Sequence, residues 1–194
     1  MSPLPLPANP NLITPGLVAL LRQEFRLEWQ GLHGAPHWAR VRSNGLYLAR
    51  LTGANTSVVD YFAFLHDACR HTDGHDPEHG PRAVRFALGI RESHIDLGDL
   101  EFSLLLAAIE GHTSGRRHQD VTVSACWDAD RLDLARVGIE PDPSRLCTAP
   151  ARDPELIRRA SATARRWVEC YFGRGFRDEP KCKHDVRRLH RGRF

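Results

Sequence analysis

The sequence predicts an all-α fold in a single domain. Gly and Pro residues divide it into segments in which apolar residues recur every three or four positions, the period of a helix. Strand patterns are nearly absent, because Val121-Thr122-Val123 is the only triplet typical of a strand and it leads into a helical pattern. A chain of 194 residues, 41% of them hydrophobic, is long enough to bury a core without the help of disulfides.

Capping and terminating residues define the first two predicted helices. Thr14 is a favoured N-cap and Pro15 suits the first helical position, so we expect a helix from there to about Trp29. A break that contains several glycines follows. The second helix is expected from about 36 to 51, and it stops at Gly53 because Gly commonly terminates helices.

The remaining helices follow from similar signals. Ser57 is the expected cap of a third helix that reaches Asp67, and a polar loop rich in turn residues comes after it. The run Asp76-Pro77-Glu78 combines a cap, a proline and an acid near the positive end of the helix dipole, so a fourth helix should start there and reach about Ile90. Further helices are expected at 99–111, at 121–137 and from Asp153-Pro154-Glu155 onward.

The chain divides into a Pro-rich segment at 1–15, a helical domain at 16–172 and a basic tail at 173–194. The formal net charge is +3, but residues 152–194 alone carry 13 Arg or Lys against 6 Asp or Glu. This basic C-terminal segment indicates either a surface for nucleic acid or another polyanion, or a solvated helix and tail.

Several protein classes are excluded. The longest apolar stretch, 104–109, is far shorter than the roughly 18 residues of a membrane span, so no membrane partner is expected. The first residues lack the basic start of a signal peptide, and five cysteines without paired spacing do not predict a disulfide framework. We therefore expect a cytoplasmic location. The sequence does not indicate an oligomeric state.

Five predicted helices place ionisable side chains on the face that their apolar residues predict to be buried. Each side chain alone could be a hydrogen-bonded core residue, a cap or an ion-pair partner. Because buried carboxylates and imidazoles need partners, one shared metal centre would explain all of them. The predicted ligands are His37, His66, Asp67, His79, His112 and Asp130. Such a nitrogen and oxygen set suits Mn, Fe, Co, Ni or Zn better than Mg.

Three parts of this ligand set form a recognisable pattern. They are His37 in Pro-His-Trp-Ala-Arg-Val, the pair His66-Asp67 after Phe-Leu, and Asp130 in Trp-Asp-Ala-Asp-Arg-Leu. In order and helical setting the pattern resembles the HD superfamily of metal-dependent phosphohydrolases, above all its small single-domain members, over a motif core of about 33–137. The resemblance implies hydrolysis of a phosphate ester of a nucleotide or related small molecule by metal-activated water.

The resemblance also bears on the number of metals. Some HD proteins hold a second metal with two further histidines, and His79 and His112 occupy suitable positions. This implies two ions with Asp67 as the bridging carboxylate, and a single ion is the alternative. Certain members with one metal carry an acid three residues after the HD aspartate. Arg70 stands at that position here, a departure that argues against that subtype and its substrate class.

Other residues near the proposed centre could act on the substrate. Arginine forks match phosphate oxygens, so Arg70, three residues after the catalytic Asp67, is the first expected phosphate-binding residue, and Arg40 on the second helix is the next. In the loop that follows, Asp73 or His75 could serve as general acid or orient the attacking water. The alternative for this loop is exposure to solvent without a chemical role.

Two other functions remain open. A nucleic-acid phosphodiesterase would use both the metals and the basic C-terminal segment. A non-catalytic module would use that segment alone to bind nucleic acid or a protein partner. The sequence does not separate monoester from diester substrates.

Overall fold

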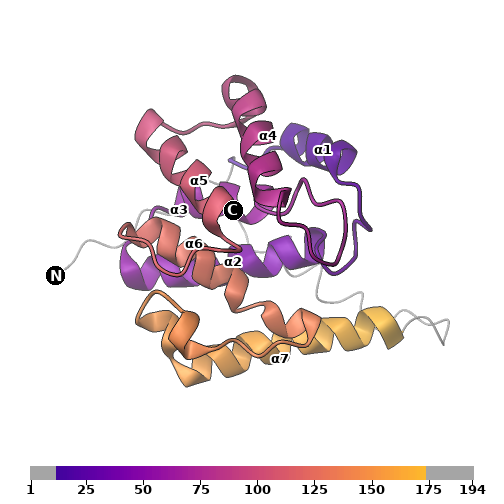
Figure 1. The fold of residues 1–194 in the computed structure, drawn as a ribbon, viewed down its shortest axis with the longest axis vertical. Coiled ribbons are helices and arrows are strands. Elements are labelled where there is room, and N and C mark those ends of the chain that lie inside the picture. The colour runs from indigo at the N-terminus through magenta and orange to yellow at the C-terminus, as the bar shows by residue number, and fades with distance from the viewer. Residues whose placement is uncertain (1–11, 174–194) are drawn as a thin grey trace.

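The computed structural model describes residues 12–173, which form seven α-helices and three short 3₁₀ helices (Figure 1). The prediction of an all-α fold is confirmed, since these residues contain no strand. The α-helices are α1 (Pro15–Glu24), α2 (Ala35–Thr52), α3 (Thr56–Leu65), α4 (His79–His94), α5 (Asp99–Gly111), α6 (Val121–Arg131) and α7 (Pro154–Gly173). The 3₁₀ helices η1 (Leu134–Val137), η2 (Pro143–Arg145) and η3 (Pro150–Arg152) lie between α6 and α7.

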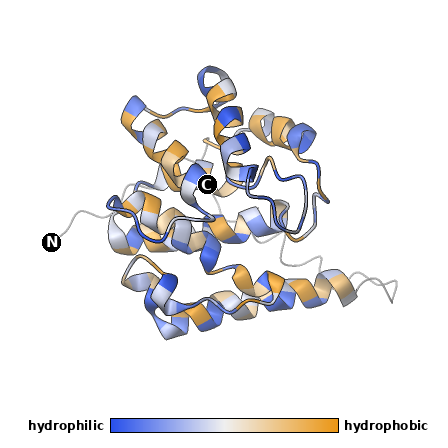
Figure 2. Cartoon of the chain, viewed as in Figure 1, coloured by the Kyte–Doolittle hydropathy of each residue, from blue (hydrophilic) through white to orange (hydrophobic). Residues whose placement is uncertain are grey.

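All of the predicted domain at 16–172 lies in this range. Residues 1–11 and 174–194, which include nearly all of the predicted basic tail, lie outside the described residues. In the part that the structure describes, no helix is both long enough and apolar enough to cross a membrane. Figure 2 shows hydrophobic and hydrophilic residues on different sides of the same helices, the distribution expected of helices that pack around a shared core.

The first helix agrees with the sequence at its start but not at its end. Thr14 caps α1 as predicted, accepting a hydrogen bond from the Leu17 amide. The helix ends at Glu24, five residues before the predicted limit, because Phe25 takes an extended conformation. The Phe25 ring packs edge-on against Trp29 and Trp38, and these aromatic contacts form instead of another helical turn.

Two predicted caps are wrong. Asn55, rather than Ser57, caps α3, because its side chain accepts hydrogen bonds from the amides of both Ser57 and Val58. Asp76 does not cap α4, which begins only at His79. Its carboxylate instead accepts hydrogen bonds from the His71 amide and the Arg82 side chain. The predicted helix 121–137 is also interrupted: α6 ends at Arg131 and η1 follows as a separate turn.

Close packing of α2 against α3 and α6 positions the site. A Cβ atom at Gly45 of α2 would lie 2.6 Å from Val59 Cγ1 and 3.3 Å from the Ala129 Cβ, so only glycine allows this approach. Trp38, Leu48 and Val41 of α2 are fully buried in the contact. The first turn of α2 is thereby held beside the end of α3.

A buried carboxylate attaches the irregular segment after α6 to the core. Asp128 is fully buried, and its Oδ1 accepts the Cys147 amide at 2.7 Å. Its Oδ2 accepts both the Thr148 amide at 2.7 Å and the Thr148 hydroxyl at 2.8 Å. These three hydrogen bonds fix the segment that leads through η3 into α7.

We expect Asp128→Ala to lower the free energy of unfolding by about 3 kcal/mol, because three donors, two of them buried, lose their acceptor. Urea unfolding followed by circular dichroism measures the change. Asp142→Ala is the matched control, because Asp142 is exposed and accepts only from the Ser144 residue beside it. Equal losses in the two variants would contradict the anchoring role of Asp128.

Candidate metal centre

The six predicted ligands all lie at the ends of helices, and five helices bring these ends together. His37 is in the first turn of α2 and His79 is the first residue of α4. His66 and His112 are the C-caps of α3 and α5. Asp67 follows His66, and Asp130 is in the last turn of α6. Three of these helices direct their C-terminal ends, which carry partial negative charge, toward the site, whereas α2 and α4 direct their N-terminal ends there, so the helix dipoles partly offset one another.

The four imidazoles share one hydrogen-bonding pattern. The Nδ1 atoms of His66 and His112 lie 3.1 and 2.7 Å from the carbonyl oxygens of Phe62 and Ile109, and Nδ1 of His79 contacts the Asp76 carbonyl. A carbonyl oxygen can only accept, so each of these Nδ1 atoms carries the proton. In the neutral imidazole, Nε2 then carries no proton, and its lone pair is free to bind a metal.

His37 shows the same pattern with a carboxylate. Its Nδ1 donates to Asp133 Oδ2 at 2.7 Å. Asp133 is held in turn by Arg40, which donates from Nε to Oδ1 at 2.7 Å and from Nη2 to Oδ2 at 3.0 Å. A carboxylate behind a metal-binding histidine fixes the ring orientation and raises its basicity as a ligand.

The first group of ligand atoms contains His37, His66 and Asp67. The Nε2 atoms of the two histidines are 3.1 Å apart, and Asp67 Oδ2 lies 3.6 Å from His37 and 3.8 Å from His66. Asp130 Oδ1 adds a further oxygen at 3.5 Å from the His37 Nε2. Two ligands that each lie about 2.1 Å from one ion are themselves about 3 to 4 Å apart, so these separations suit a single bound metal.

The second group contains Asp67 again, with His79 and His112. Asp67 Oδ1 lies 3.3 Å from the Nε2 of His79 and 3.6 Å from that of His112, and the two Nε2 atoms are 2.8 Å apart. The two oxygens of Asp67 therefore face different groups. A carboxylate placed between two ligand groups in this way could contribute one oxygen to each.

The protonation states favour metal binding at neutral pH. Burial lowers the pKa of both His37 and His66 to about 4, so both rings are neutral. Burial alone would raise the pKa of Asp67, but the neighbouring His66, His112 and Arg70 outweigh it and hold that pKa well below its usual range. Burial opposes ionisation of Asp133 as well, yet its hydrogen bonds from His37 and Arg40 lower its pKa to about 2.

Two features of the cluster suit a bound cation. The Asp130 Oδ1 atom is buried and accepts no hydrogen bond from any residue that the structure describes. The Nε2 atoms of His79 and His112 face each other as two acceptors, and the pKa of His112 is raised, against the effect of burial, by its contact with Asp67. The other donors near the His79 Nε2 are Arg70 Nη1 at 3.4 Å and the Thr113 hydroxyl at 3.3 Å.

The expected phosphate-binding arginines are placed differently. Arg70 lies beside the second group, with Nη1 at 3.4 Å from both Asp67 Oδ1 and His79 Nε2. Arg40 lies behind His37, on the Nδ1 side of the ring, where its guanidinium is engaged by Asp133. The structure therefore places Arg40 among the residues that position His37, not beside the metal-facing atoms.

The loop after Arg70 covers the second group of ligands. Arg70 donates to the carbonyl oxygens of Thr72 and Gly74, at 3.3 and 2.8 Å. Asp73 is exposed, and its Oδ1 forms a 2.8 Å hydrogen bond with Nδ1 of the buried His33. His75 is exposed and lines a pocket of about 370 Å³ that His79, Arg70, Glu110 and Thr113 also line. This pocket opens onto the second group.

Sequence reasoning missed two residues of the site. Asp133 supports His37, and Arg136, which is 6% exposed, places Nη1 at 3.9 Å from Asp130 Oδ1. Arg136 is itself held by the Leu32 carbonyl at 3.0 Å. Asp130, Asp133 and Arg136 are spaced three residues apart, a helical spacing that could have indicated a shared face.

We expect the chain to bind two equivalents of Mn²⁺, measured by isothermal titration and elemental analysis. Asp67→Ala should lose both, because both groups share this carboxylate, whereas His112→Ala should lose one. His118→Ala is the control, since His118 is exposed and belongs to neither group. A wild-type chain that binds one equivalent, unchanged in His112→Ala, would contradict the second site.

Comparisons of this chain with protein-family models, with curated proteins and with solved structures give no match. The argument for function therefore depends on the arrangement of the buried histidines and aspartates, which could hold metal ions and is compatible with a centre of the HD type.

Proposed function

We propose that this protein is a metal-dependent phosphohydrolase with a dinuclear centre of the HD type. The observation that supports the proposal most strongly is the position of Asp67, whose Oδ2 faces His37 and His66 and whose Oδ1 faces His79 and His112. Divalent ions bound in such a pair supply an activated water nucleophile and neutralise charge on a phosphoryl group. Mn, Fe, Co, Ni and Zn all suit these ligands.

The two ligand groups suggest different tasks. The first group, His37, His66 and Asp67, has Asp130 Oδ1 as a further oxygen 3.5 Å from the His37 Nε2. The second group has no such additional carboxylate among the contacts of its histidines in residues 12–173, and it borders the pocket of about 370 Å³. Metal sites with open positions are typical of catalysis. In our proposal the substrate phosphate therefore enters beside His79.

Residues around this pocket would bind and orient the phosphate. Arg70 is 9% exposed and held on both sides by backbone carbonyls, so its guanidinium is fixed before substrate arrives. Its Nη1 faces the second ligand group, where it is placed to donate to a phosphate oxygen. His75, which lines the same pocket, is the candidate general acid for the leaving oxygen. The Asp73 carboxylate is bound to His33. In our proposal Asp73 therefore positions the loop and does not contact the attacking water.

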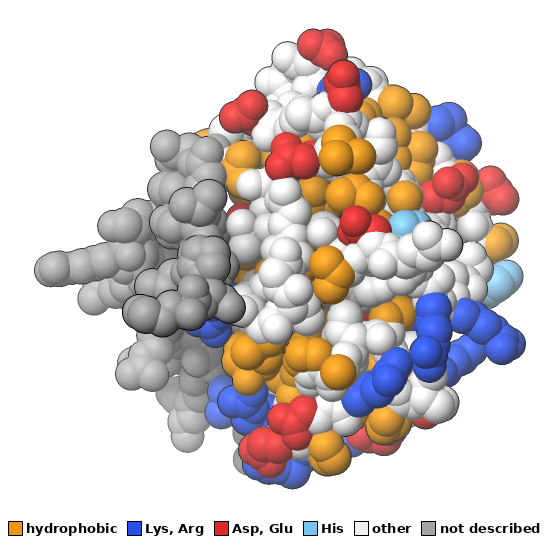
Figure 3. All heavy atoms as spheres, turned by 90° about the vertical axis from the view of Figure 1, so that its left-hand side faces the viewer, with side chains coloured by type: hydrophobic (Ala, Val, Ile, Leu, Met, Phe, Trp, Pro, Cys, Tyr) orange, Lys and Arg blue, Asp and Glu red, His pale blue; other side chains and the backbone are white. Residues whose placement is uncertain are grey.

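The size of the pocket favours a small phosphate ester, such as a nucleotide, over a nucleic acid. Pockets of 300–1,000 Å³ are typical of small-molecule sites, and this one is near the lower limit. Figure 3 shows one face of the molecule, on which acidic, basic and apolar side chains all occur. That face offers no uniformly basic surface to a polyanion. The predicted tail lies outside the described residues, so its part in binding nucleic acid stays a prediction.

The direct test of the proposal is phosphate release by the Mn²⁺-loaded chain from a panel of mononucleotides, cyclic nucleotides and nitrophenyl phosphate mono- and diesters. We expect turnover of at least one member, abolished by a chelator and by His66→Ala, because His66 holds the first ion. His118→Ala should retain full activity. Hydrolysis that persists in His66→Ala, or no hydrolysis of any member by chain with two bound ions, would overturn the proposal.

A second prediction concerns Arg70. Arg70→Ala should lower kcat/KM by about 100-fold, the loss that is typical when one fixed donor to a transition-state oxyanion is removed. Steady-state kinetics on the best substrate measures the change, with metal content determined in parallel because Arg70 also contacts Asp67. Arg85→Ala is the control, since Arg85 is exposed on α4. Unchanged kcat/KM in Arg70→Ala at full metal content would exclude this role.

A further inference from the structure

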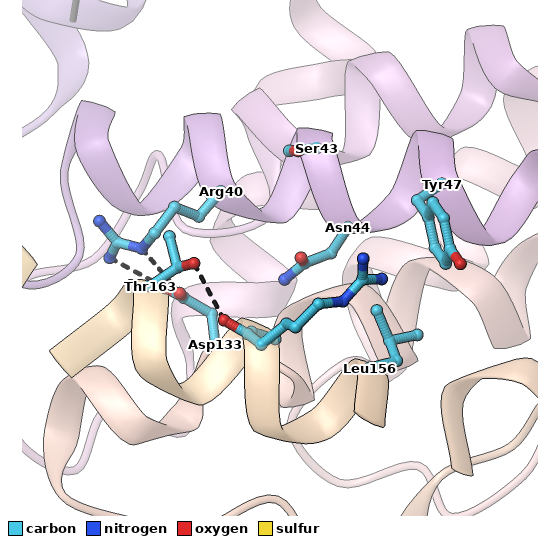
Figure 4. Close-up of a pocket in the computed structure, with 9 residues that line it drawn as sticks. Arg40, Ser43, Asn44, Tyr47, Asp133, Leu156 and Thr163 are labelled. Carbon is cyan, nitrogen blue, oxygen red and sulfur yellow. Dashed lines mark hydrogen bonds and ion pairs between the residues drawn. The ribbon is translucent and has the colours of Figure 1, made fainter. Parts of the chain in front are cut away.

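A second pocket lies between α2 and α7, apart from the one that opens onto His79 (Figure 4). It measures about 340 Å³, and Arg40, Ser43, Asn44 and Tyr47 of α2 line it on one side, with Arg159 and Thr163 of α7 on the other. The two pockets share no lining residue. The catalytic proposal makes no use of this space.

The accessible charge of this second pocket is positive. Its only carboxylate, Asp133, is 1% exposed and is already bound by Arg40, by His37 and at longer range by Arg136. Arg159 is exposed, and its nearest acidic neighbour, Glu155, is already bound by Arg158 and interacts with Arg159 only at longer range. A ligand that enters would therefore meet a guanidinium with no carboxylate in direct contact, which favours an anion.

The groups beside Arg159 also suit a phosphate. The Arg159 guanidinium carbon lies 5.5 Å from the centroid of the Tyr47 ring, within the range of a cation–π contact, and Arg50 lies 5.6 Å from the same ring. The Ser43 hydroxyl, on the α2 side, is exposed and is available as a further donor. Leu156 and Ala160 supply an apolar surface. A mixture of one cation, polar donors and apolar surface is typical of a site for a small organic anion.

The pocket is connected to the metal centre through two hydrogen-bonded pairs. Arg40 holds both oxygens of Asp133, and Asp133 Oδ2 accepts from His37 Nδ1 at 2.7 Å. His37 Nε2 belongs to the first ligand group. Figure 4 shows Arg40 and Asp133 joined at one end of the pocket. Arg159 contacts Tyr47 at the other end of the pocket, so an anion beside Arg159 would act on the Arg40–Asp133 pair through its charge and not by direct contact.

We propose that the pocket between α2 and α7 binds a phosphate-bearing small molecule, no larger than a mononucleotide, and that its occupancy is coupled to metal binding through Arg40, Asp133 and His37. The molecule is an effector and not the substrate, because this pocket lies on the Nδ1 side of His37, away from the metal-facing Nε2. Coupling is reciprocal, so metal binding changes the affinity for the effector by the same factor.

The first experiment is isothermal titration of inorganic phosphate and of AMP into the full chain after chelation, with circular dichroism to confirm that the fold is retained. Chelation removes the contribution of the metals to phosphate binding, and the variants in the α2–α7 pocket separate binding there from binding at Arg70. We expect one binding site, weakened at least tenfold in Arg159→Ala and blocked in Ser43→Trp, which fills the pocket without removing charge. Arg158→Ala is the matched control, because Arg158 is the adjacent exposed arginine and pairs with Glu155.

Several results would overturn this site: no binding of either probe at millimolar concentration, an equal loss in Arg158→Ala, or full binding in both Arg159→Ala and Ser43→Trp. None of them depends on turnover, so failure here leaves the hydrolase proposal intact, and the reverse also holds.

The second experiment tests the coupling. Mn²⁺ affinity is measured with and without AMP in the wild-type chain and in Arg159→Ala. Direct binding of AMP to the metals contributes equally in both, so the difference between them isolates the pocket. We expect AMP to change Mn²⁺ affinity at least fivefold more in the wild-type chain. Equal effects in the two proteins would show that the pocket and the metal centre are independent.

Discussion

Unprotonated ligand atoms that face one another in the core impose the main constraint on this structure. The Nδ1 atom of each of four histidines is committed to an oxygen acceptor, so the four Nε2 lone pairs point inward together with the oxygens of Asp67 and Asp130. Acceptors at such separations repel unless a cation lies between them. Arg70 and Arg136 supply positive charge at the edge of the cluster, but metal ions can satisfy all the inward atoms at once.

The packing of the helices holds these ligand atoms in place. Because each ligand is at the end of a helix, a small number of packing contacts fixes the whole set, and the glycine at position 45 allows the approach of α2 to α3 that brings His37 to His66. Supporting residues then fix each ring. Asp133 illustrates how one side chain can connect two parts of the molecule, since it touches a metal ligand on one side and lines the α2–α7 pocket on the other.

The sequence predicted those features that repeat with the helical period. The all-α fold and the position of His37, His66, His79 and His112 on buried faces follow from apolar spacing, and the structure brings these four together. Features that depend on contacts between residues far apart in the sequence were not predicted. The early end of α1 depends on aromatic contacts between Phe25 and two tryptophans. The bond between His37 and Asp133 spans 96 residues, and no local pattern encodes it. The sequence predicts Arg40 to contact the substrate because its partner, Asp133, is 93 residues away and equally hidden from local pattern.

The most direct measurement of the central claim is the anomalous diffraction of a crystal of the full chain loaded with Mn²⁺. Our account predicts two anomalous peaks about 3.5–4 Å apart, one beside His37 and His66 and the other beside His79 and His112, with one oxygen of Asp67 directed at each. A single peak would contradict the bridging role of Asp67. Peaks only at surface carboxylates, with the buried histidines unliganded, would contradict the metal centre altogether.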